Sequence, residues 1–296
     1  MTKSFEDASA KTGSDDYVTL VKWFSKFQLA AIEGDARAQL VLGNMYHAGS
    51  GVILDYAEAL RWYKLAAEQG DDYAMEKIGD MCRSGQVFST DFAEAVRWYT
   101  LAAEKGNASA QYELGQAYRN GQGVSQDYNE ALRWYKLAAD QGITSALLML
   151  GAMHEYGDGV EKNYSEAIKW YKLAAAKDDD FAQYQLAQMY RYGHGVMKNY
   201  AEALGWYTLA AKQSHAKSQF NLGMMYCEGI GVLQDYTTAY MWLNLAAASG
   251  DKNAVEKLEV VSNEMSINQI AEAQKLAREC QARNFKNCDI SHYWNL

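Results

Sequence analysis

The chain has 296 residues, a formal net charge of −9 and a sequence pI of about 5.1. Hydrophobic residues make up 49% of it and charged residues 22%, which is ordinary for a globular protein. The acidic balance disfavours a nucleic-acid partner, and no apolar run reaches the about 18 residues that a membrane span needs. No charged segment followed by an apolar one opens the chain, so no signal peptide is expected on it.

The N-terminal segment divides into a tail and a capping helix. Residues 1–16 are polar and small, and we expect them to form a loose tail. Residues 17–34 form the next element, which ends in LAAIEG, close to the LAAEQG that ends the first full repeat. We predict a half-repeat helix here, because a terminal hairpin of an array otherwise exposes its apolar face.

A 36-residue repeat then fills residues 35–250. Its most regular stretch is DYNEALRWYKLAADQG, from Asp127 to Gly142. The other copies start, without insertion or deletion, at Asp55, Asp91, Asn163, Asn199 and Asp235. The tryptophans keep the same step at Trp62, Trp98, Trp134, Trp170, Trp206 and Trp242. A period of about 20–50 residues is typical of a repeat array.

This stretch reads as the second helix of each repeat. Asp or Asn opens every copy as an N-cap, and a Glu follows three residues later in five of the six. Ala59, Trp62 and Tyr63 begin an apolar face at helical spacing. Glycine ends the helix in four copies, Gly70, Gly106, Gly142 and Gly250, while Asp178 and Ser214 replace it in the other two.

A first helix precedes it in every repeat, as in ARAQLVLGNMYHAGSGV from residue 36 to 52. Five copies carry a glycine inside this helix, where Gly costs roughly 1 kcal/mol against Ala: Gly43, Gly79, Gly115, Gly151 and Gly223. We interpret them as marks of close contact between helix backbones; the fifth repeat has Ala187 instead. Each repeat is therefore a helical hairpin, and stacked hairpins make a right-handed all-α solenoid in one elongated domain.

The C-terminal segment, residues 251–296, is predicted to cap the other end. Residues 252–262 resemble another first helix, and residues 266–285 form a longer amphipathic helix. The ending SHYWNL, residues 291–296, is aromatic for a tail and is interpreted as a contact with the cap or with a partner.

The repeat pattern resembles a known family. The consensus A-x-x-x-LG-x-x-Y-x-x-G-x-GV-x-x-DY-x-EA-x-x-WY-x-LAA-x-x-G is similar to the Sel1-like repeat, a relative of the tetratricopeptide repeat known from bacterial proteins, over residues 35–250. Two departures stand out. Val87 and Phe88 replace the usual Gly-Val of the turn, which predicts a reshaped turn there, and the whole chain lacks proline.

No catalytic or metal-binding motif accompanies the repeats. The five histidines form no HExxH pair, and no GxSxG elbow occurs. The GxG turns lack the lysine and the preceding strand of a phosphate loop. We therefore expect no enzyme activity, no metal and no cofactor.

The resemblance implies a binding surface on the first helices, because these line the concave groove in tetratricopeptide relatives. Counting from the LG and Tyr signature, positions such as Arg37, Leu40 and Asn44 share that face. Aromatic, amide and guanidinium groups suit peptide capture; the alternative is that the tyrosines pack between repeats. The predicted partner-binding residues are Arg83, Tyr112, Gln116, Arg119, Tyr156, Tyr184, Gln188, Arg191, Tyr192 and Phe220.

The four cysteines leave the compartment open. Cys82 and Cys227 are interpreted as free thiols in first helices. Cys280 and Cys288 are eight residues apart, a spacing that secreted members of the resembled family often use for a disulfide. A disulfide there would indicate a periplasmic or secreted protein, whereas free thiols would indicate the cytoplasm.

The sequence thus predicts a monomeric protein-interaction scaffold that binds a protein or peptide in the groove. Two alternatives remain. Some relatives are linked to cell-wall or β-lactam chemistry, which implies a small-ligand binder or enzyme. The gap-free period and missing proline also fit an engineered repeat protein with no native ligand.

Overall fold

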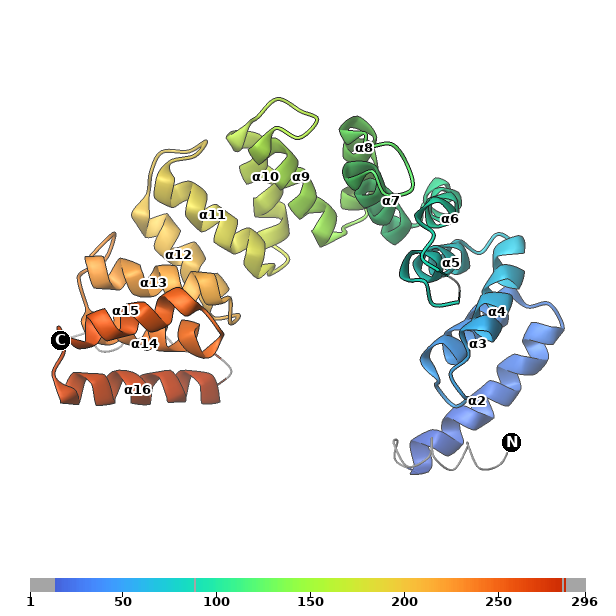
Figure 1. Ribbon diagram of the computed structural model, residues 1–296, viewed down its shortest axis with the longest axis horizontal. Coiled ribbons are helices and arrows are strands. Elements are labelled where there is room, and N and C mark those ends of the chain that lie inside the picture. Colours follow the sequence, from blue (N-terminus) through green and yellow to red (C-terminus); the bar gives the residue numbers. More distant parts are fainter. Residues whose placement is uncertain (1–13, 88, 284, 286–296) are drawn as a thin grey trace. The chain divides into compact units, whose positions relative to one another are not determined.

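The computed structural model describes residues 14–87, 89–283 and 285, which form α-helices joined by turns, with no strand in these ranges (Figure 1). Six helical hairpins follow one another: α3 (Ala36–Ala48) with α4 (Tyr56–Glu68), α5 (Asp72–Ser84) with α6 (Phe92–Glu104), α7 (Ala108–Asn120) with α8 (Tyr128–Asp140), α9 (Thr144–Tyr156) with α10 (Tyr164–Ala175), α11 (Asp180–Tyr192) with α12 (Tyr200–Ala211), and α13 (Ala216–Glu228) with α14 (Tyr236–Ala248). The flanking helices are α2 (Ser14–Ile32), α15 (Lys252–Ser262) and α16 (Ile267–Ala282). The predicted all-α solenoid of six hairpins is confirmed. None of these helices is long and apolar enough to cross a membrane.

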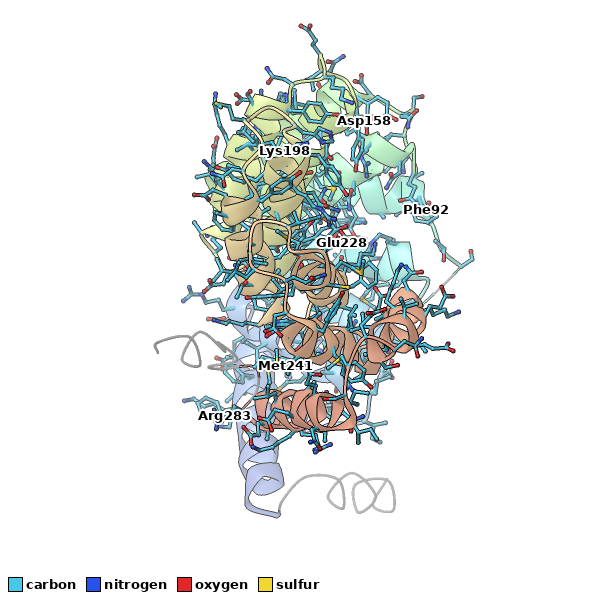
Figure 2. All side chains as sticks on the ribbon, turned by 90° about the vertical axis from the view of Figure 1, so that its left-hand side faces the viewer. Phe92, Asp158, Lys198, Glu228, Met241 and Arg283 are labelled. Atoms are coloured by element: carbon cyan, nitrogen blue, oxygen red, sulfur yellow. The ribbon has the colours of Figure 1, made fainter. Side chains whose placement is uncertain are left out.

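The contacts divide the chain into two compact units, an N-terminal unit up to Ala146 and a C-terminal unit from Leu147. In the N-terminal unit α2 packs on α3, and each second helix packs on the next first helix, α4 on α5 and α6 on α7. In the C-terminal unit α12 packs on α13, and α15 and α16 cover α14. Figure 2 shows the side chains that these contacts bring together, among them the buried Met241 of α14. The helix α2 begins at Ser14, three residues before the predicted start.

The helix ends follow the predicted capping pattern. Asp55 Oδ1 accepts hydrogen bonds from the backbone N–H groups of Ala57 and Glu58, at 2.9 and 3.0 Å. Gly70 has a φ of 92°. Where glycine is missing, Asp178 and Ser214 still adopt positive φ values of 60° and 68°. The repeat thus keeps this left-handed turn even where a side chain makes it unfavourable.

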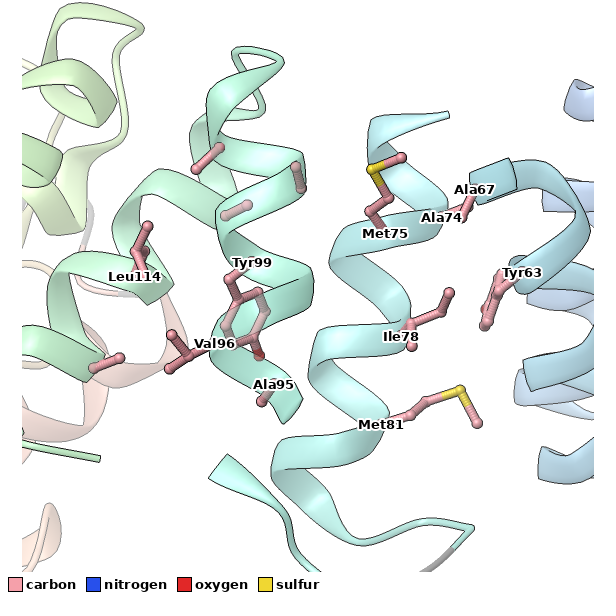
Figure 3. Close-up of a cluster of buried hydrophobic side chains, with 14 of the residues drawn as sticks. Tyr63, Ala67, Ala74, Met75, Ile78, Met81, Ala95, Val96, Tyr99 and Leu114 are labelled. Carbon is pink, nitrogen blue, oxygen red and sulfur yellow. The ribbon is translucent and has the colours of Figure 1, made fainter. Parts of the chain in front are cut away.

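The glycines inside the first helices make room for an aromatic ring, so the predicted backbone-to-backbone contact is wrong for most of them. A Cβ on Gly79 would lie 2.6 Å from Cε1 of Tyr99, the buried tyrosine of the same hairpin (Figure 3). Gly43, Gly115 and Gly151 face their own tyrosines in the same way. Gly223 faces a leucine instead of a ring: its Cβ would lie 2.8 Å from Cγ of Leu243 and 3.1 Å from the Ala239 carbonyl oxygen, so this glycine is close to backbone as well.

Buried glutamines on first helices contact the end of the preceding helix and the end of the second helix of their own repeat. Gln39 Nε2 donates to the Ala31 carbonyl oxygen at 3.1 Å, and its Oε1 accepts from Gln69 Nε2 at 2.8 Å. Gln111 and Gln141 repeat the second bond at 2.9 Å. In two repeats the residue equivalent to Gln39 is apolar, and the residue equivalent to Gln69 is then a lysine. The pairs are Met75 with Lys105 and Leu147 with Lys177. In these two repeats both positions change, as expected for a buried amide that needs a partner; in the sixth repeat Gln219 stays and Ser249 replaces the second glutamine.

Candidate functional site

The predicted partner-binding residues fall on first helices in both compact units. Arg83 lies on α5, and Tyr112, Gln116 and Arg119 lie on α7, all in the N-terminal unit. The C-terminal unit carries the rest: Tyr156 on α9, Tyr184, Gln188, Arg191 and Tyr192 on α11, and Phe220 on α13. The two sets are therefore described separately.

Two of the predicted amides are held inside the hairpins. In the N-terminal unit, the hydroxyl of the buried Tyr135 donates to Gln116 Oε1 at 2.5 Å, and Gln116 Nε2 donates to the Tyr112 hydroxyl at 2.9 Å. Burial raises the pKa of the Tyr135 hydroxyl, which therefore stays protonated as the donor. Gln116 thus satisfies a buried hydroxyl, and its two polar atoms already have partners.

The same polar chain recurs in the fifth repeat and disappears as a whole in the sixth. Tyr207 donates to Gln188 Oε1 at 2.5 Å, and Gln188 Nε2 donates to Tyr184 at 2.6 Å. The corresponding residues of the sixth repeat are all apolar: Phe220, Met224 and Leu243. This joint replacement fits an internal network, because a buried polar group without its partner is costly. The fourth repeat solves the same problem differently: Leu148 and Ala152 replace the first two residues, and Tyr171 donates to Glu155 Oε2 at 2.7 Å instead.

The arginines are anchored across neighbouring repeats. Arg191 Nη1 donates to Asn221 Oδ1 at 2.7 Å, which ties α11 to α13. Arg83 Nε donates to the Tyr99 hydroxyl at 3.0 Å and lies 3.9 Å from Glu113 Oε2 on α7.

Both pairs span 30 residues, and a third contact has the same spacing. Gln185 Nε2 of α11 donates to Glu155 Oε2 of α9 at 3.1 Å. Glu113, Gln185 and Asn221 were not predicted to belong to the site. The three residues occupy equivalent positions of the third, fifth and sixth repeats, where the fourth repeat has Met149, and each is 30 residues from its partner. That shared position and spacing is the signal that would have identified them.

Exposed aromatic rings gather on the first helices of the C-terminal unit. The exposed fraction is 63% for Tyr156, 45% for Phe181 and 53% for Tyr192. The Phe181 ring centroid lies 6.4 Å from that of Tyr184. Burial raises the pKa of the Tyr184 hydroxyl, and the nearby hydroxyls of Tyr192 and Tyr156 raise it further. These four residues form one surface, which we call the aromatic face.

Neighbouring groups hold Tyr192 in place. Its ring stacks on His194 at 5.8 Å, and His194 stacks on Tyr164 at 4.8 Å. The guanidinium of Arg191 lies 5.5 Å from the Tyr192 ring, within the range of a cation–π contact. An exposed ring that is already ordered loses little entropy when a partner covers it.

His215 is the N-cap of α13 and lies next to Tyr184 of the aromatic face. Its Nδ1 accepts from the backbone N–H of Ser218 at 3.2 Å, and its ring lies 4.9 Å from that of Tyr184. Burial lowers the pKa of His215; Asp180 and Asp179 oppose this shift, and Lys217 adds to it. Protonated His215 cannot accept the capping bond.

We expect this cap to make the chain less stable in mild acid. Because the folded-state pKa of His215 lies below its usual value near 6.5, the unfolded chain binds more protons below that pH. Stability contributed by the neutral cap is therefore present above about pH 6.5 and is lost as the pH falls toward the folded pKa. His215→Asp restores the acidic cap that Asp35, Asp71 and Asp179 form in other repeats and should remove this pH-dependent loss.

Urea unfolding at a series of pH values from 7.5 to 5 checks the expectation. If the variant and the natural chain lose the same stability over that range, His215 is not the responsible group.

Within the described residues, no three His, Cys, Asp or Glu side chains gather as metal ligands would. Cys82 and Cys227 are free, and burial raises the pKa of both thiols. Cys280 is buried on α16. Cys288 lies outside the described residues, so the Cys280–Cys288 disulfide stays a prediction.

Comparison with known proteins identifies the repeats. The family model for the Sel1 repeat matches residues 36–71, 72–107, 108–143, 144–179, 180–215 and 216–251. One similar solved structure is c5321, a protective antigen present in uropathogenic Escherichia coli strains and displaying an SLR fold. It has 33% identity and a TM-score of 0.81, and the match covers 90% of this chain and 57% of that one. This chain thus spans little more than half the length of that protein.

A second similar structure is a Sel1 repeat protein from Oxalobacter formigenes. It has 35% identity and a TM-score of 0.72, and the match covers 81% of this chain and 69% of that chain. No curated protein matches the sequence.

Proposed function

The chain belongs to the Sel1 repeat family, whose members are commonly protein-interaction scaffolds, and from that premise we propose that it captures a peptide segment of a partner protein on its aromatic face. The exposed rings of Tyr156, Phe181 and Tyr192 carry the proposal. Tyrosine is enriched among the residues that dominate interface energies. A patch of several exposed rings on one surface, unlike a single exposed ring, is typical of an interaction site.

The arrangement of the face suits a peptide. The rings give contact area, and their hydroxyls give hydrogen bonds at the edge of each ring. The side-chain bonds from Gln185 to Glu155 and from Arg191 to Asn221 hold the three first helices in register beneath them. Gln188 and much of Tyr184 support the surface from inside, so Tyr156 and Tyr192 are the residues that we assign to the partner.

Removing the two exposed tyrosines should abolish capture without unfolding the chain. We expect Tyr156→Ser with Tyr192→Ser to lower partner capture at least tenfold, since buried tyrosines at interfaces contribute about 1–3 kcal/mol each. Each exposed substitution should change the free energy of unfolding by no more than about 0.5 kcal/mol. A pull-down from a lysate of the source organism, with bound protein quantified, measures the capture, and urea unfolding measures the stability.

Tyr73→Ser is the matched control. Tyr73 also lies on a first helix, α5, and its exposed fraction is 60%, but it belongs to the other compact unit. Capture should persist in this control. Undiminished capture by the double variant, or equal loss in the control, would refute the assignment to the aromatic face.

A further inference from the structure

A cavity of about 190 Å³ lies in the N-terminal unit between α5, α6 and α7. It is lined by side chains from all three helices and by Gln122 of the turn that follows α7. Its volume is well below the roughly 300–1,000 Å³ of pockets that hold drug-sized ligands. The cavity therefore fits a single side chain of a partner better than a whole cofactor.

The wall of the cavity holds a carboxylate that accepts no hydrogen bond from another residue in the part of the chain that the structure describes. Glu113 lines the cavity from α7. Among the described residues, its polar contact is Arg83 Nε at 3.9 Å, which is too long for a hydrogen bond. That Nε already donates to the hydroxyl of Tyr99 at 3.0 Å. Burial raises the pKa of Glu113, Asp80 and Glu76 add to this shift, and Arg83 and Lys77 oppose it.

The ion-pair network that reaches Glu113 holds one more carboxylate than it holds cations, while Arg119 lies outside it and acts on Tyr112 of the lining. Lys77 pairs with Glu76 at 3.1 Å and with Asp80 at 3.4 Å. Arg83 lies 3.6 Å from Asp80 as well as near Glu113. Two cations are thus shared among three carboxylates, so a further cation at the cavity would be favoured and a further anion would not.

The rest of the lining suits the stem and the head of a basic side chain. Phe92 and Val96 of α6 and Ala117 of α7 give an apolar wall, against which the methylene groups of Arg or Lys can pack. Tyr112 and Tyr99 also line the cavity, and their ring faces attract a cation.

We propose that this cavity receives one basic side chain, arginine or lysine, with Glu113 as its counter-ion. Its assignment to a partner's side chain rests on the proposed function, whereas the preference of the cavity for a cation does not. The N-terminal unit would then supply a charge-specific pocket, while the aromatic face of the C-terminal unit supplies contact area. Arg83, predicted above to contact the partner directly, instead acts here by orienting Glu113 and Tyr99.

The test uses the full chain and three small probes: Nα-acetyl-arginine amide, its neutral isostere Nα-acetyl-citrulline amide, and Nα-acetyl-glutamate amide. Binding is followed by NMR titration of the backbone amides of α6 and α7. We expect the arginine probe to bind about tenfold more tightly than the citrulline probe, as one charged hydrogen bond allows. Glu113→Gln should remove that preference.

Glu104→Gln is the control, because Glu104 is exposed on α6 outside the cavity and its loss changes the net charge by the same amount. Arginine binding that is lost equally in both variants, or retained in Glu113→Gln, overturns the proposal. The proposal is also overturned if the arginine probe shifts no backbone amide signals of α6 and α7. Tighter binding of the glutamate probe overturns it as well, because the cavity would then bind an anion at Arg83. Glu113→Asp, which keeps the charge, should retain the preference if the variant effect is electrostatic.

These probes need no partner protein, so the outcome is independent of the pull-down. If the natural chain shows no preference for the arginine probe but the aromatic face still captures a partner, only the cavity proposal fails. If the preference is found but the aromatic face captures no partner, only the proposed function fails.

Discussion

Gly123→Ala is expected to lower the free energy of unfolding by about 3 kcal/mol or more, the larger of two glycine effects in this fold. Gly123 has a φ of 77°, which costs an L-residue roughly 1–2 kcal/mol. A Cβ there would also lie 2.2 Å from the carbonyl oxygen of Phe92 and 2.8 Å from the backbone nitrogen of Ala93. Because both contacts are with backbone, no side chain can rotate away, and overpacking adds about 1–3 kcal/mol.

Gly106→Ala separates the steric contact from the backbone strain. Gly106 has a φ of 96°, yet a Cβ there meets no atom within 4 Å. Its substitution should cost only the strain, and the difference between the two variants in urea unfolding gives the contribution of the contact. Equal losses would mean that the turn after α7 does not press on the start of α6.

The second repeat shows what happens without this glycine. Val87 occupies the position equivalent to Gly123, and the positive φ values among the described residues do not include it. The predicted reshaping of this turn therefore holds for the backbone of Val87; Phe88 lies outside the described residues.

The helices and their order could be predicted because each signal is local and recurs in at least five of the six repeats. The Asp or Asn caps, the Trp-Tyr pair and the Ala-Ala pair act within one hairpin. The partner of the helical glycines could not be predicted in this way. A glycine indicates that something approaches closely, but Gly79 alone does not tell whether a backbone or the Tyr99 ring fills the space.

The candidate site was predictable as a helix face but not as a set of free side chains. Gln116 and Gln188 lie where the face meets the core, so helical spacing assigns them equally well to a partner or to a buried hydroxyl. In the sixth repeat Met224 replaces this glutamine and Leu243 replaces the buried tyrosine. Their joint replacement favours a role inside the hairpin, because a residue that served only a partner would not need to change with the core. The same reasoning applied to the 30-residue spacing would have found Glu113.

The polar chain of the third repeat gives the second large effect. Tyr135→Leu should cost about 3 kcal/mol, because it leaves a cavity and removes the hydroxyl that Gln116 Oε1 accepts. Adding Gln116→Met and Tyr112→Phe reproduces the apolar set that the sixth repeat uses around Gly223. The third repeat has Gly115 at the position of Gly223. The methionine introduced by Gln116→Met therefore follows a helical glycine, as Met224 does in the sixth repeat.

The triple variant should therefore be more stable than the sum of its single variants by about 1–3 kcal/mol, which is the range of coupling between residues of one network. Urea unfolding of the single, double and triple variants measures this coupling. Additive losses would show that the three residues act independently and would return Tyr112 and Gln116 to the set of residues available to a partner. Strong coupling would instead mean that the partner meets a surface whose amides are already satisfied, so that its specificity must come from exposed rings and from the charge at Glu113.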